Sequence, residues 1–297
     1  MNGRFKKAPL IYVVARINTT PVPDFKDELP LLQKKMLRLG LVTPLVGRAT
    51  QLSFQQAIGP EMSVQHKYVE RVGYFSIDKD ECLLIDSGGI EYRVTKYNKY
   101  KNFIERFEQL ISAVRQNLDY FQNIIVSEIV LSYADVVIPL SNRKLDDYFI
   151  NGPAQLPLAQ MENVSADVQQ VGQFQIERVT RQTQKTTLLL EQLNSIESPN
   201  PSNSLRAASR FMPMPLVEFD PVLAMPLILQ EHWTGFTSPY YALIMTQTSA
   251  LIKNVAFGKL DIIEVFLPIH VEANETFMKL LNRSTCDKDW EYEDIPE

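Results

Sequence analysis

The sequence predicts an α+β protein made of two related halves, each an antiparallel sheet with a long helix packed across it. Three alternating apolar segments between residues 71 and 97 predict an antiparallel meander. A wide apolar stripe at helical spacing follows the meander directly. After residue 150 the same order of strands and then a long helix recurs more loosely, which indicates a second half of the same type.

The first regular element is a β-branched run at residues 9–18, which predicts a strand buried on both faces. A short helix follows, with Pro30 in its first turn, because later in the helix a proline would remove a hydrogen bond. Leu32, Met36 and Leu39 share one face of that helix, and Gly40 ends it.

The meander consists of segments 72–77, 82–85 and 90–96, with the glycines at 88 and 89 in its second turn. The helix that follows has one apolar stripe, formed by Phe103, Phe107, Leu110, Ile111, Val114, Leu118 and Phe121. Another apolar strand is predicted at residues 126–139.

The glycine and prolines between residues 143 and 162 indicate a connector, so we expect an N-terminal α+β domain at 1–150 and a C-terminal α+β domain at 151–297. A hairpin is predicted at residues 172–192, a strand at 240–249, and a helix at 260–281 that Pro268 kinks or restarts. We expect a Ser/Pro-rich surface loop near 194–209 and a frayed acidic end at 287–297.

Composition favours a soluble cytoplasmic chain of 297 residues, with 45% hydrophobic and 22% charged residues. The formal charge of −5 argues against broad, sequence-independent binding of phosphates. No segment approaches the ~20 apolar residues of a membrane span, and no signal sequence is apparent. Cys82 and Cys286 are expected to be free thiols, because a disulfide framework needs more cysteines.

Several motifs resemble a sporadically distributed, uncharacterised family of bacterial proteins of about this length. They are the opening Ala-Pro-Leu strand at residues 8–14, the Tyr-Phe-Ser motif at 74–78, the helix and strand at 103–133, and a C-terminal His270-x6-Phe277 helix. The resemblance is clearest over residues 8–140. By analogy, the family's patchy distribution implies an accessory role in a bacterial defence or toxin–antitoxin locus.

The sequence contains none of the common nucleotide-binding, hydrolase or zinc-protease motifs, so we predict no cofactor and no metal. Asp78, Asp80 and Glu81 offer oxygen ligands, but acidic residues are also usual in a tight turn, and we favour the turn. His270, near Glu272 and Glu275, is either a packed histidine, which we favour, or a metal ligand or general base.

An aromatic cluster at residues 231–241 is the predicted binding site. Trp and Tyr side chains often anchor protein interfaces, although the cluster is equally typical of a strand end that enters the core. The residues assigned to this site are His232, Trp233, Phe236, Tyr240 and Tyr241.

We therefore predict a non-enzymatic protein-binding or assembly component whose partner is another protein or a second copy of the chain. One alternative is an enzyme whose site forms around His270 and His232 from residues distant in sequence. A second is a nucleic-acid-binding protein that uses Lys96, Lys99 and Lys101 with the tyrosines at 97 and 100, an arrangement that holds single strands by charge and stacking. We favour a solvated helix start for that basic segment.

Overall fold

In the computed structural model a single nine-stranded antiparallel sheet runs through the chain, with the order β3-β4-β5-β6-β2-β7-β10-β9-β8. The structure describes residues 3–21, 28–56, 62–150, 171–180, 183–194, 212–218, 220, 222–224 and 240–294. The strands of this sheet are β2 (Leu10–Thr19), β3 (Leu41–Gln56), β4 (Met62–Ser76), β5 (Glu81–Asp86), β6 (Gly89–Val94), β7 (Ile125–Val137), β8 (Val171–Thr180), β9 (Gln184–Asn194) and β10 (Tyr240–Ala256).

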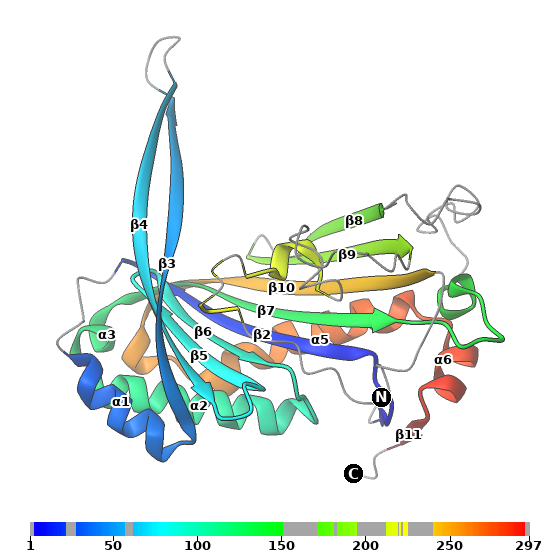
Figure 1. The fold of residues 1–297 in the computed structure, drawn as a ribbon, viewed down its shortest axis with the longest axis horizontal. Helices are drawn as coiled ribbons and strands as arrows, with labels where there is room; N and C mark the ends of the chain where they lie inside the picture. Colours follow the sequence, from blue (N-terminus) through cyan, green and yellow to red (C-terminus); the bar gives the residue numbers. More distant parts are fainter. Residues whose placement is uncertain are drawn as a thin grey trace.

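The helices gather on one face of the sheet (Figure 1). Those that form the main core with the sheet are α1 (Leu29–Arg38), α2 (Tyr100–Asn117), α3 (Asp119–Asn123) and α5 (Ile262–Leu280). The short helix α6 (Arg283–Asp289) packs near the end of β7, where Tyr148 stacks on Trp290.

The α+β class is confirmed, but the expectation of two related halves is wrong. β10, from the second half, pairs with β7, from the first half, over most of the length of both strands. One helix, α5, also contacts β7, β9 and β10 together. The reason is that β7 would otherwise leave a row of unpaired backbone groups at its edge, which the later strands cover. The domain division near residue 150 stays a prediction, because the connector at 151–170 lies outside the described residues.

Most of the local predictions in the first half are confirmed. The first strand, the short helix with Pro30 in its first turn, the three-stranded meander and the apolar stripe all form as expected. Gly89 lies so close to the carbonyl oxygen of Ile17 that a Cβ atom there would clash with it, which explains the glycine in that turn. The predicted long helix ends at Asn117, and Leu118 adopts an extended conformation before α3 begins.

The second half follows the prediction in part. β8 and β9 form the expected hairpin, and α5 continues through Pro268 without a restart. The prediction of a frayed acidic end is wrong for residues 287–294, because β11 (Tyr292–Asp294) pairs with β1 (Gly3–Phe5). Phe5 anchors this ribbon by packing its ring edge-on against Trp290. The Ser/Pro-rich loop falls almost wholly on residues 195–211, which lie outside the described part of the chain.

Both cysteines are free thiols, as the sequence predicts, and both are buried. No helix among the described residues is long and apolar enough to cross a membrane.

Candidate protein-interaction arm

The most distinctive feature of the molecule is a long two-stranded arm, formed by the outer parts of β3 and β4 (Figure 1). The two strands pair from Leu41 with Ser76 to Gln56 with Met62. The next strand, β5, pairs with β4 only at Val72–Phe75. Residues 47–56 and 62–71 therefore pair only with each other among the described strands. At about 3.4 Å per residue, the arm extends roughly 30 Å beyond the sheet.

A single leucine fills the space at the base of the arm. Leu223 is fully buried against Gly47 and Gly73, which lie on neighbouring strands at the start of the arm, where Gly47 pairs with Arg71 and Gly73 with Leu45. A Cβ atom at Gly47 would lie 2.6 Å from Leu223, and one at Gly73 would lie 2.7 Å from Leu84. The two glycines therefore allow the segment around Leu223 to approach the strands closely and to hold the arm in place.

A network of ion pairs braces the same region. Glu218 accepts hydrogen bonds from Arg71 at 2.7 Å and from Arg93 at 2.8 Å. Arg93 also pairs with Glu91, which Arg16 contacts at 3.2 Å. Burial on its own would raise the pKa of Glu91 and Glu218, but the nearby arginines outweigh it and lower both values. These carboxylates are held ionised and paired, so the network is suited to fixing the base of the arm and not to proton transfer.

Exposed apolar side chains lie beside this base. Val42 and Val46 of β3 are 38% and 58% exposed, whereas the exposed Ile77 follows the end of β4 that is remote from the arm. Pro44, also exposed, lies between the two valines on the edge strand. A proline lacks the backbone N–H, so it discourages pairing of this edge with a further strand. The base of the arm therefore presents apolar side chains of β3, while the outer arm has two edges that pair with no other described strand.

The binding residues predicted from the sequence are only partly described. His232, Trp233 and Phe236 lie outside the described residues. Tyr240 begins β10, and Tyr241 is half-buried against the core on the face of the sheet opposite the main helices. Tyr241 fits the reading of a strand end that enters the core. A binding role for this cluster stays a prediction.

His270 is packed between two tyrosines. Its Nδ1 atom lies 2.7 Å from the hydroxyl of Tyr133, and its ring stacks on Tyr100 with 3.8 Å between the ring centroids. Burial lowers the pKa of His270 to about 4, so the ring is neutral at physiological pH. The nearby carboxylates of Glu272 and Glu275 pair with Arg178 and Lys279. This environment favours the packed histidine.

In the basic segment before α2, the aromatic rings pack against other side chains of the protein. Lys96, Lys99 and Lys101 are exposed. Tyr97 packs against Phe103 and Tyr133, while Tyr100 covers His270. The rings that would stack on bases are thus partly occupied by the core, which weakens the case for a nucleic-acid site.

Asp78 and Asp80 lie in the turn between β4 and β5, as favoured from the sequence, and Glu81 begins β5. Asp80 accepts a hydrogen bond from the Ser76 hydroxyl at 2.7 Å. Glu81 pairs with Arg106 at 2.6 Å and accepts a hydrogen bond from Tyr92. Across the described part of the chain, no group of three His, Cys, Asp or Glu residues could hold a metal ion.

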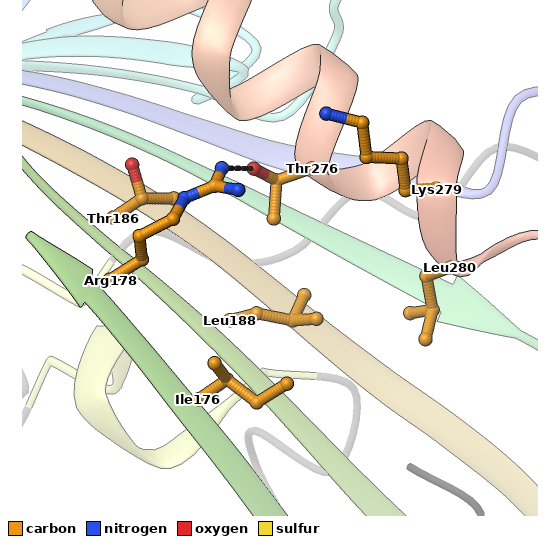
Figure 2. A pocket seen from close by; sticks show the side chains of 7 residues that line it. All are labelled: Ile176, Arg178, Thr186, Leu188, Thr276, Lys279 and Leu280. Carbon is orange, nitrogen blue, oxygen red and sulfur yellow. Dashed lines mark hydrogen bonds between the residues drawn. The ribbon is translucent and has the colours of Figure 1, made fainter. Parts of the chain in front are cut away.

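A small pocket of about 240 Å³ lies between the hairpin β8–β9 and the C-terminal half of α5 (Figure 2). Ile176, Leu188 and Leu280 supply its apolar walls. Arg178 crosses it toward α5, where it pairs with Glu272 and donates to the Thr276 hydroxyl at 3.0 Å. The pocket is suited to a small apolar group and brings together no nucleophile, base and acid.

Sequence reasoning missed both the arm and the pocket. The sequence does contain a pattern that could have predicted the arm. Apolar and β-branched residues occur on both sides of the Gly59-Pro60 pair, and such a pair is a usual turn signal. The pocket leaves none, because its walls come from segments about 90 residues apart in sequence.

Comparison with family models and with curated proteins finds no relative. No family model matches the chain, and no curated protein matches it. The resemblance to the uncharacterised bacterial family therefore stays a prediction from the sequence motifs.

Proposed function

We propose that this protein is a non-enzymatic assembly component that binds a protein partner through the β3–β4 arm. The observation that carries the proposal is the length of the arm, in which about ten residues of each strand pair with no other described strand on their outer edges. An isolated two-stranded hairpin is marginally stable in water. An arm of this length is therefore best explained as a surface that a partner covers.

The chemistry of the arm indicates how the partner binds. Unpaired strand edges offer rows of backbone N–H and C=O groups, which recruit a strand or loop of another protein. The apolar side chains of Val42 and Val46, on β3 beside the base, add a small patch that gains free energy when covered. The partner is thus expected to combine an extended segment with an apolar surface. Membership of a bacterial defence or toxin–antitoxin locus is part of the proposal and rests on the sequence resemblance alone.

The test is to remove the arm without disturbing its base. Replacing residues 48–70 by the turn Asn-Gly joins Gly47 to Arg71, which already face each other in the register. Leu223 and the Arg71–Glu218 pair are retained, so we expect the thermal unfolding temperature to change little. Tagged intact and arm-less proteins are then purified gently from the native host, and the proteins that copurify in stoichiometric amount are identified.

A partner that copurifies with the intact chain and is lost from the arm-less chain supports the proposal. Val179→Glu, at an exposed position on the opposite edge strand β8, is the matched control and should retain the partner. The proposal is wrong if the arm-less protein retains the partner, or if the intact protein is isolated alone.

A further inference from the structure

The pocket between the β8–β9 hairpin and α5 has a polar end and an apolar end (Figure 2). Two neighbouring cross-strand pairs of the hairpin line it, Arg178 with Thr186 and Ile176 with Leu188. The first pair supplies a guanidinium and a hydroxyl group, whereas the second supplies only hydrocarbon. Residues two apart on a strand share one face and are separated by ~7 Å, so the polarity of the hairpin wall changes over about that distance.

The wall formed by α5 has the same order. Thr276 accepts a hydrogen bond from Arg178 at 3.0 Å, so it lies at the polar end. Leu280 follows about one helical turn later, on the same face of the helix, and is also a lining residue. Both walls therefore place polar groups at one end of the cavity and apolar side chains at the other. Such a cavity matches a molecule that itself has one polar and one apolar end.

The polar end offers hydrogen-bond donors on cations. Arg178 contacts both Glu272 and Thr276 through one nitrogen, Nη2, and its Nε and Nη1 atoms donate to no residue in the described ranges. Lys279 makes an exposed 3.4 Å contact with Glu275, and an ion pair of this kind holds a side chain only weakly. Neither Glu272 nor Glu275 lines the pocket, so both charged side chains that line it in the described chain are cations.

We propose that this pocket binds a small amphipathic carboxylate. Its carboxylate group lies against Arg178 and Lys279, and its hydrocarbon chain covers Ile176, Leu188 and Leu280. A carboxylate accepts hydrogen bonds from a guanidinium or an ammonium group, and such charge-assisted bonds are stronger than neutral ones. The apolar end adds affinity because it removes the hydrocarbon chain from water.

The volume of the pocket limits the ligand to a short chain. An apolar cavity of ~150 Å³ is large enough to bind benzene. The pocket holds about 240 Å³. At the ~30 Å³ that each water molecule takes up in the liquid, this space corresponds to roughly eight non-hydrogen atoms, the number in hexanoate.

The first experiment titrates the purified full-length protein with straight-chain carboxylates from butanoate to decanoate and follows binding by ligand-observed NMR. Each added methylene that the pocket buries should lower the dissociation constant about fourfold. The gain should stop between hexanoate and octanoate, because further methylenes extend beyond the cavity. The uncharged 1-hexanol should bind at least about tenfold more weakly than hexanoate, since it lacks the charge-assisted hydrogen bonds.

The second experiment changes the two ends of the pocket separately. Ile176→Trp fills the apolar end and should abolish binding of both hexanoate and 1-hexanol. The matched control is Val179→Trp, the same change on the opposite face of β8, which should leave hexanoate binding unchanged. Arg178→Met removes the donors and keeps an apolar side chain, so the affinity for hexanoate should fall at least about tenfold while that for 1-hexanol is retained. Unfolding temperatures verify that each variant is folded.

The inference is overturned if no carboxylate of the series binds, or if folded Ile176→Trp still binds hexanoate. It is also overturned if the affinity continues to rise through decanoate, or if Arg178→Met still prefers hexanoate to 1-hexanol. The arm-less variant should bind hexanoate as the intact protein does, because β8 lies at the opposite edge of the sheet from β3. Hexanoate binding and partner binding can therefore fail independently, which separates this inference from the proposed function.

Discussion

At the scale of single residues, Asp135 and His270 lie between the sheet and the helices, and burial shifts their pKa values in opposite directions. Asp135 of β7 is 4% exposed, and burial raises the pKa of its carboxyl group to about 8. His270 of α5 has its pKa lowered to about 4 by burial. Asp135 lies two residues from Tyr133 on the same face of β7, and Tyr133 contacts His270. At neutral pH Asp135 and His270 are therefore both mainly in their neutral forms.

The raised pKa of Asp135 predicts a loss of stability as the pH rises. In the unfolded chain an aspartate has a pKa of about 3.9, so between roughly pH 4 and pH 8 the folded state binds the extra proton and stability falls with rising pH. His270 acts in the opposite direction, but only below about pH 6.5, since above that value it is neutral in both states. Between pH 6.5 and pH 8.5 the contribution of Asp135 is therefore isolated from that of His270.

The variant Asp135→Asn, which is neutral at every pH, tests this account. Relative to the variant, the original protein should lose on the order of 2 kcal/mol of unfolding free energy between pH 6.5 and pH 8.5. Urea unfolding at the two pH values measures the difference. Parallel pH dependences for the two proteins would show that Asp135 is not protonated in the folded state.

The residues that matter at this scale were only partly predictable. The packed state of His270 and the structural role of the acidic turn were favoured from the sequence, because common local causes explain both. Asp135 gave no signal, since its neighbours Leu10 and Ile244 come from strands at opposite ends of the chain. Whether an ionisable side chain is buried depends on such long-range neighbours, which local patterns do not reveal.

At the scale of elements, the arm depends on the close approach at its base. Gly73→Ala would place a Cβ atom 2.7 Å from both Leu84 and Phe75, and 3.0 Å from Leu223. Relieving these contacts should cost roughly 1–3 kcal/mol of stability. The matched control is Gly88→Ala, whose new Cβ atom meets its nearest neighbour, Asp86, at an ordinary 3.4 Å. Thermal and urea unfolding of both variants measure the effect, and equal stabilities would contradict the proposed packing at Gly73.

Elements with strong local patterns were predicted well. The alternation in the meander, the helical stripe from Phe103 and the run that forms β2 each specify one element through local sequence alone. The break at Leu118 and the pairing of the C-terminal segment with β1 were not predicted. Both depend on contacts with distant residues, such as those of Phe121 with Phe257 and of Phe5 with Trp290.

At the scale of the whole molecule, the sheet joins the two parts of the chain. β7 and β10 pair along most of their length, and α5 covers strands from both parts. The sequence suggested two similar halves because the order of strands and helix recurs. Local patterns identify strands but do not state which strands pair, so a continuous sheet and two separate sheets give the same signal.

This architecture predicts that the chain unfolds as one unit. Urea unfolding followed by tryptophan fluorescence, which reports Trp233 and Trp290 in the second half, should coincide with unfolding followed by far-UV circular dichroism, which reports both halves. Coincident transitions are expected because neither half can unfold without breaking the β7–β10 pairing. Two separate transitions would contradict a single cooperative sheet.

The central claim, that the arm is the surface that reaches a protein partner, is tested most directly by crosslinking in the native host. A photo-crosslinking amino acid is placed at position 52 or 66, which face each other in the arm, and at position 79, in the turn between β4 and β5, as a control. We expect both arm positions to crosslink to the same protein and the control position to give no such product. Crosslinks from position 79 but not from the arm, or none from any position, would contradict the claim.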